Sequence, residues 1–191
     1  LAALQDWLDK DDQPRESGGA EESFYTASAL PYRCKNASVD TLRELLLVRG
    51  FTPELLDGHD NMPGLATVLT VWTSGLINVN TAPLPVLAAL VNTEDALQAW
   101  DLAQRLDSYR RDPVNRSTLA SPAWLENEEA GGKGIQWPTD ILTIKSLYFS
   151  VLLRARSGAS VKRLYVVLER NQPAAAGRQE SPLAVLYKEL R

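Results

Sequence analysis

Two acidic clusters close to the first residue constrain this chain more than any other feature. Asp6-Trp7-Leu8-Asp9-Lys10-Asp11-Asp12 is followed by Gly18-Gly19-Ala20-Glu21-Glu22, and together they hold six carboxylates. Lys10 interrupts the first cluster, and Arg15 lies between the two. Carboxylates this close repel one another and raise each other's pKa unless a cation lies among them. The fold must therefore leave this loop in water or supply it with a cation.

A divalent metal ion is one candidate for that cation, because calcium takes oxygen ligands from carboxylates, carbonyls and water. Asp9 and Asp11 have the alternate spacing that directs two carboxylates to one point, and Glu21 or Glu22 is placed to close the shell across the glycine turn. A solvated acidic loop is the alternative, since acidic runs are common on protein surfaces. The local pattern leaves both open.

The spacing excludes an EF-hand. Counted from Asp9, the fifth residue is Gln13 and the sixth is Pro14. An EF-hand loop needs an oxygen ligand and then a glycine at those two positions. Any metal site here is therefore of another type.

The composition narrows the classes of function. With 191 residues and 45% hydrophobic content, the chain can form one large or two small domains with a core. The net charge of -4 argues against a nucleic-acid or anionic-membrane surface. Cys34 and His59 are the single cysteine and histidine, which excludes an internal disulfide, a cysteine-based zinc site and a His-His metal site.

The ends of the chain carry no targeting signal that the sequence reveals. It has no apolar run long enough to span a membrane and no signal peptide. Because it starts at Leu1 rather than methionine, we expect a fragment or a mature piece of a longer protein.

Short helices are predicted through the first two thirds of the chain. Residues 1–8 have the pattern of a helix end. Further helices are expected after Ser38, after Thr52-Pro53, after Thr81 and from Thr93, where capping residues precede apolar patterns. The last of these has apolar positions at helical spacing, namely Ala96, Leu97, Trp100, Ala103 and Leu106. Leu65 to Trp72, rich in valine, leucine and threonine, is a candidate strand.

The pattern changes after Thr139. Residues 141–156, 161–169 and 183–190 are β-rich, which predicts a three-stranded antiparallel meander. Gly158 is expected in one turn, and residues 174–181 in a long hairpin loop. A loop-rich stretch over residues 110–139 precedes this sheet.

Two other kinds of chemistry are disfavoured by the sequence. Asn78-Val79-Asn80-Thr81-Ala82 is similar to the entry of a helix-hairpin-helix DNA-binding element, but the following hairpin lacks glycine and carries two acids. A pair such as Asp9 and Glu21 could serve glycoside hydrolysis, yet no other polar cluster offers a substrate cleft. Trp124 and Trp137 lie in loop sequence and are expected to be exposed, where they would mark a partner surface.

Five short motifs follow one another along the chain. They are Asp6-Trp7-x-Asp9-x-Asp11, Gly18-Gly19-Ala20-Glu21, Pro31-Tyr32-Arg33-x-x-Asn36, Glu44-Leu45-x-x-Val48-x-Gly50 and Ile77-Asn78-Val79-Asn80-Thr81-Ala82. In this order they resemble the general secretion pathway protein K family, the large minor pseudopilins of type II secretion systems. The resemblance spans most of residues 5–170, and Ser146-Leu147-Tyr148-Phe149 and the β-rich end also fit.

The resemblance implies an α+β fold, in which a pseudopilin-type antiparallel sheet packs on an N-terminal helix and carries a large helical insertion. Residues 1–27 would be the helix end and acidic loop, residues 28–138 the inserted domain, and residues 139–191 the sheet. It also implies calcium in the acidic region. The ligand role passes to Asp9, Asp11, Glu21 and Glu22 and, less closely, to Asp6, while Glu22 stands where the family is expected to have aspartate.

The implied function is non-enzymatic. The protein would cap the pseudopilus tip together with other minor pseudopilins, and secreted substrates are a partner class that the resemblance leaves open. The expected location is the periplasm, with the parent protein held in the inner membrane by a helix that is absent from this chain. This chain is therefore expected to be soluble and to bind no nucleic acid. A free-standing calcium-binding or adhesive module is the alternative function.

Overall fold

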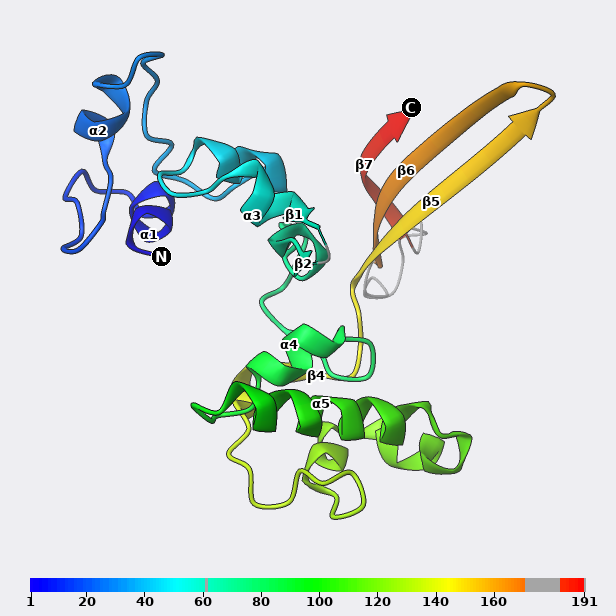
Figure 1. Cartoon of the computed structure of the whole chain (residues 1–191). Coiled ribbons are helices and arrows are strands. Elements are labelled where there is room, and N and C mark those ends of the chain that lie inside the picture. The colour runs from blue at the N-terminus through cyan, green and yellow to red at the C-terminus, as the bar shows by residue number, and fades with distance from the viewer. Residues whose placement is uncertain (61, 171–182, 191) are drawn as a thin grey trace, which may run out of the picture. The chain divides into compact units, whose positions relative to one another are not determined.

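The computed structural model describes residues 1–60, 62–170 and 183–190 (Figure 1). The chain divides into two compact units, unit 1 (Leu1–Val71) and unit 2 (Trp72–Arg191). The predicted division into residues 1–27, 28–138 and 139–191 stays a prediction. It describes an inserted domain, which is recognised by comparing folds, whereas the two units are defined by packing within this chain.

Unit 1 consists of short helices joined by long loops. Its elements are α1 (Ala2–Leu8), α2 (Glu22–Thr26), the 3₁₀ helix η1 (Leu42–Leu47), α3 (Pro53–Asp57), the paired strands β1 (Gly58–His59) and β2 (Met62–Pro63), and the 3₁₀ helix η2 (Leu65–Thr67). The expected helix end at residues 1–8 is confirmed as α1. Helices this short gain little from intrinsic propensity and depend on tertiary packing.

The core of unit 1 forms around Trp7. Its buried residues are Ala3, Trp7, Ala20, Tyr25, Leu45, Val48 and Leu56. The Trp7 ring meets Tyr25 edge-on with centroids 5.1 Å apart, and its Nε1 donates to Glu44 Oε1 at 3.0 Å. This buried indole therefore has its polar atom paired, as a buried tryptophan requires.

The other predicted elements of unit 1 differ in how well they match the structure. Thr52 caps α3 as expected, since its side chain accepts a hydrogen bond from the Leu55 N–H and Pro53 occupies the first turn. The helix expected after Ser38 is instead a 3₁₀ helix that begins after Thr41. The strand expected over Leu65 to Trp72 is wrong, because the structure has only the short η2 and irregular backbone there. Strand propensity depends strongly on context, so a composition rich in β-branched residues did not decide the backbone.

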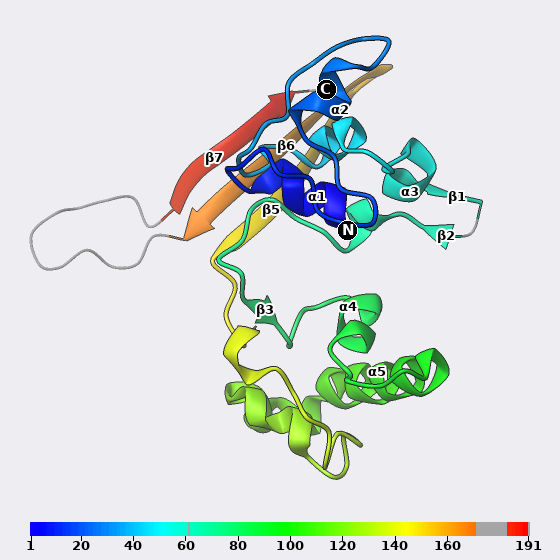
Figure 2. The ribbon, with the colours of Figure 1, turned by 90° about the vertical axis from the view of Figure 1, so that its left-hand side faces the viewer.

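Unit 2 begins with a helical layer. Its elements are β3 (Ile77–Asn78), α4 (Leu84–Ala89), α5 (Ala96–Arg111), the 3₁₀ helices η3 (Pro113–Ala120), η4 (Pro122–Glu126) and η5 (Thr139–Ile141), and β4 (Leu142–Thr143), which pairs in parallel with β3. Helices α4 and α5 lie side by side (Figures 1 and 2). Both predicted helix starts are displaced. Helix α5, expected from Thr93, begins after its cap Asp95, and Pro83, not the predicted cap Thr81, precedes α4.

Long-range packing selects which face of α5 is buried. The inward residues are Ala99, Leu102, Ala103, Leu106 and Tyr109. Leu97 and Trp100, which the apolar pattern assigned to this face, are 83% and 41% exposed. The period was right, but the face is rotated toward residues that meet α4 and the following 3₁₀ helices.

Trp124 and Trp137 are core residues, so their predicted exposure is wrong. They are 3% and 9% exposed. Trp124 stacks on Tyr109 with centroids 5.8 Å apart, and its Nε1 donates to Asn80 Oδ1 at 2.8 Å. Trp137 belongs to the same core cluster and donates to the Gly132 carbonyl at 3.3 Å. Both lie in irregular or 3₁₀ backbone, and the local sequence does not reveal that they are buried.

The predicted antiparallel meander is confirmed. Strands β5 (Tyr148–Ser157), β6 (Ser160–Arg170) and β7 (Leu183–Leu190) form a sheet in the order β5-β6-β7 (Figure 1). Gly158 has φ +58° and lies in the β5–β6 turn, as expected. The long hairpin loop predicted at residues 174–181 lies outside the described residues. The chain is thus an α+β protein with several helices and an antiparallel sheet.

Candidate metal centre

The acidic loop is organised by Asp6, which lies on α1 and has no exposed surface. Its Oδ2 accepts hydrogen bonds from the Ala20 N–H at 2.8 Å and the Arg15 N–H at 3.2 Å. The Arg15 side chain adds an ion pair, with Nε 3.3 Å from Oδ1. A buried carboxylate needs such partners, so Asp6 ties both ends of the loop to the helix.

Gly19 is required by the same arrangement. A Cβ at this position would collide with Asp6 Oδ2 and with the backbone of Arg15. The neighbouring Gly18 has φ +107°, a backbone conformation that side chains disfavour. The Gly-Gly pair therefore lets the chain pass against Asp6 and return toward α1.

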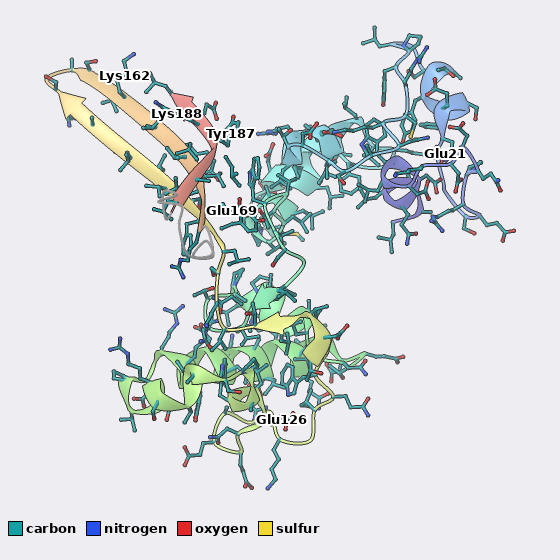
Figure 3. The ribbon with its side chains drawn as sticks, turned by 180° about the vertical axis from the view of Figure 1, so that it is seen from behind. Glu21, Glu126, Lys162, Glu169, Tyr187 and Lys188 are labelled. Atoms are coloured by element: carbon teal, nitrogen blue, oxygen red, sulfur yellow. The ribbon has the colours of Figure 1, made fainter. Side chains whose placement is uncertain are left out.

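This return brings Glu21 into the interior. Glu21 precedes the first residue of α2 and is 1% exposed; Figure 3 shows it beside α1. One carboxylate oxygen from each of Asp9, Asp11 and Glu21 lies within 4.8 Å of the other two. The structure thus brings together three of the five residues that the sequence predicted as ligands.

Unpaired oxygen atoms support a cation at this point. Asp9 Oδ1 and both Glu21 carboxylate oxygens are buried, and no described donor meets hydrogen-bond geometry with them. The other Asp9 oxygen is taken by Arg15 Nη2 at 2.9 Å. Buried charges in proteins are paired or bind metals. The residues present therefore fit a hard cation with oxygen ligands.

The electrostatics agree with the geometry. Burial raises the pKa of Glu21, the nearby Cys34 thiol opposes this rise, and the carboxylates of Asp6, Asp9 and Asp12 add to it. Burial, together with the charge of Glu21, also raises the pKa of Cys34 to about 11, so this thiol stays neutral at ordinary pH. A negative potential is therefore concentrated at the cluster.

Two predicted ligands lie outside this group of three. The Asp6 carboxylate already pairs with the Ala20 and Arg15 N–H groups and with the Arg15 side chain. Glu22 Oε2 accepts a hydrogen bond from the Cys34 N–H at 2.8 Å. The other Glu22 oxygen is 3.9 Å from Arg33 Nε. Their assignment as metal ligands stays a prediction, and a structural role for both is already visible.

Asn36, which was not among the predicted ligands, lies beside the acidic loop. Its Nδ2 donates to the Asp11 carbonyl at 3.0 Å and to Asp12 Oδ1 at 3.1 Å. Its Oδ1 is buried and has no described donor, and its φ of 47° is one that asparagine tolerates. The sequence signal for it was the motif Pro31-Tyr32-Arg33-x-x-Asn36, which ends at this residue.

The motif over Ile77–Ala82 has a packing role. Asn78 Nδ2 donates to Ser146 Oγ at 2.9 Å, and Asn78 Oδ1 accepts the Asn80 N–H. Asn80 in turn joins the Leu119 carbonyl to the Trp124 indole. These asparagines hold β3 against η3, η4 and the segment before β5, which explains the motif without a ligand.

Comparison with known proteins agrees with these features. Residues 1–59, which hold the whole acidic loop, match the family model for the type II secretion system (T2SS), protein K. The type II secretion system protein K of Pseudomonas aeruginosa is 38% identical over 87 residues, covering 46% of this chain and 24% of the relative.

Two further relatives extend the match along the chain. The type II secretion system protein K of Pectobacterium carotovorum is 29% identical over 170 residues, covering 83% of this chain and 46% of the relative. The Aeromonas hydrophila protein of the same name is 29% identical over 180 residues, covering 89% and 49%. The chain thus spans less than half the length of the curated relatives it matches.

A solved structure has the same fold over the whole chain. A chain in the GspK-GspI-GspJ complex of the type 2 secretion system from enterotoxigenic Escherichia coli is matched with a TM-score of 0.58 and 19% identity, covering 100% of this chain and 61% of that one. These findings make the chain similar to proteins of type II secretion systems. Within that class, residues 1–59 match the protein K family, and the similarity to protein K sequences extends over most of the chain. No helix among the described residues has the length and apolar character that crossing a membrane requires.

Proposed function

We propose that this chain is the periplasmic part of a minor pseudopilin that caps the tip of the type II secretion pseudopilus and supports protein export. The observation that carries this proposal is the shared fold, over the full chain, with a chain of the GspK-GspI-GspJ complex. The role is structural rather than enzymatic. In this proposal the antiparallel sheet packs on an N-terminal helix, as in pseudopilins, and residues 28–138 form the helical insertion.

The partners would be two smaller minor pseudopilins, equivalent to the GspI and GspJ of the solved complex. A fibre built from head-to-tail contacts grows until a subunit blocks the next addition. A bulky helical insertion on the top subunit supplies such a block. Capping therefore requires only that the insertion blocks the next subunit and that this chain binds the subunits below it stably.

Calcium would occupy the cluster of Asp9, Asp11 and Glu21. These three carboxylates, with Asn36 Oδ1, main-chain carbonyls and water, supply the oxygen shell that calcium prefers. The bound ion would neutralise the buried Glu21 and fix the acidic loop against α1. Asp6 would act mainly by shaping the loop, and Glu22 by holding the Cys34 segment.

Mixing the chain with purified GspI and GspJ homologues of the same secretion system tests the proposal. We expect one ternary peak in size-exclusion chromatography with calcium present. Three independent peaks at micromolar concentration would contradict it and would favour a free-standing calcium-binding or adhesive module.

A further inference from the structure

The hairpin formed by β5 and β6 has a charge opposite to that of the whole chain. The chain carries a net charge of -4. Between Tyr148 and Leu168, however, the sequence holds no acidic residue and four basic ones, namely Arg154, Arg156, Lys162 and Arg163. All four are exposed, and Figure 3 shows Lys162 near the turn of the hairpin.

The strand register places the three arginines on one face. Arg154 lies directly opposite Arg163, and Arg156 lies opposite Val161. Leu152, two residues before Arg154, shares this face because side chains alternate along a strand. We call Leu152, Arg154, Arg156, Val161 and Arg163 the basic face.

The opposed pair Arg154 and Arg163 destabilises the sheet, since like charges directly opposite in an antiparallel pair repel. Within residues 1–60, 62–170 and 183–190, Arg154, Lys162 and Arg163 form no salt bridge. Cations on an edge strand such as β5 also discourage aggregation. That purpose does not account for Arg163, which is on the central strand.

Apolar side chains lie among these charges. Leu152 is 68% exposed and Val161 is 37% exposed. Arginine beside exposed apolar residues is typical of the central part of protein interfaces, where lysine is depleted. The guanidinium group also pairs with carboxylates through two parallel hydrogen bonds.

We propose that the basic face is a docking surface for an acidic protein partner, which presents carboxylates to Arg154, Arg156 and Arg163 and an apolar side chain to Leu152. A protein offers such a local acidic patch. Nucleic acid or an anionic membrane is an extended polyanion, which the net negative charge of the chain repels at longer range. This proposal holds whether or not the chain joins a pseudopilus.

The test uses the full chain and a short labelled peptide that alternates glutamate with serine, measured by fluorescence anisotropy at low salt. The same peptide with glutamine in place of glutamate is the probe control. We expect binding of the glutamate peptide alone, weakening as salt is raised. Phosphatidylglycerol vesicles and duplex DNA are measured in parallel, and we expect no binding to either.

The double variant Arg154→Gln/Arg163→Gln should weaken peptide binding at least about tenfold. Because it removes a repelling pair, its melting temperature should stay the same or rise, which separates loss of binding from loss of fold. The control Arg116→Glu changes an exposed arginine outside the sheet and should leave binding unchanged.

The proposal is overturned by any of three results: no binding of the glutamate peptide, equal weakening by Arg116→Glu, or binding to vesicles or DNA that the double variant abolishes. If the double variant fails to fold, Arg156→Gln replaces it, and undiminished binding by that variant also overturns the proposal. Formation of the ternary pseudopilin complex is measured separately, so the failure of one proposal does not imply failure of the other.

Discussion

Calcium should stabilise unit 1, and removing it should expose the repulsion within the acidic loop. Without the ion, Glu21 stays buried with both carboxylate oxygens unpaired, while Asp9 and Asp11 lie close by. The unfolded chain separates these carboxylates and does not hold them as one site. Calcium therefore binds the folded state preferentially and stabilises it by mass action.

The size of the effect follows from the affinity of such sites and the size of the unit. With a Kd of about 10⁻⁴–10⁻³ M at about 1 mM calcium, one site contributes roughly 0.4–1.4 kcal/mol. Unfolding of the whole chain in one step would give a melting shift of about 1–6 °C. If unit 1 unfolds by itself, the same free energy shifts its transition by about 2–11 °C, because a smaller unit has a smaller unfolding entropy.

The assay is thermal melting in chelator, in calcium and in magnesium. Magnesium should give a smaller shift, because it demands tighter octahedral geometry and releases water reluctantly. Asp9→Asn/Asp11→Asn should remove most of the calcium increment and cost little in chelator, since the lost pair with Arg15 is partly exposed and worth about 0–1 kcal/mol. Glu21→Gln should also abolish the increment, as it removes the buried carboxylate.

Glu16→Gln is the matched control, because Glu16 is an exposed carboxylate of the same loop outside the group of three. It should keep the full calcium shift. The metal assignment fails if the wild-type transition does not move between chelator and calcium. The choice of ligands fails if Glu16→Gln loses as much of the shift as Asp9→Asn/Asp11→Asn.

The remaining predictions concern pH and two packing contacts. In chelator, stability should fall as pH rises from 4.5 through the raised pKa of Glu21, because the folded state holds that proton more tightly; calcium should flatten this slope in pH-dependent melts. Gly19→Ala should weaken calcium binding in titration calorimetry by displacing Asp6, whereas Gly134→Ala, in an open turn of unit 2, should not. Arg110→Lys should lower the free energy of unfolding by about 1–3 kcal/mol in urea denaturation, because lysine cannot form both guanidinium hydrogen bonds to the Val79 and Ala82 carbonyls. A decrease no larger than that caused by the control Arg116→Lys would refute this.

Local sequence determined those features whose cause is local. Thr52-Pro53 predicted the start of α3, because a threonine cap and a proline in the first turn act within four residues. Alternation and turn residues predicted the β5-β6-β7 meander, because antiparallel neighbours need only a short turn between them. The crowding of carboxylates around Asp9 and Asp11 could also be predicted locally, but the local pattern left open whether the loop is solvated or holds a cation.

Tertiary packing decided the rest. Leu65 to Trp72 has strand composition but contains only the short 3₁₀ helix η2 and irregular backbone. Trp124 is buried because distant residues, Asn80 and Tyr109, meet it. The sequence did not show which of the five predicted ligands would have hydrogen-bond partners. The fold gave Asp6 two backbone donors, whereas Glu21 is buried with no hydrogen-bond donor among the described residues. Burial and unpaired oxygens depend on where α2 returns against α1, and residues far apart in the chain fix that position. The sequence therefore determined that carboxylates would crowd together, and only the tertiary structure decided which of their oxygens remain free for a cation.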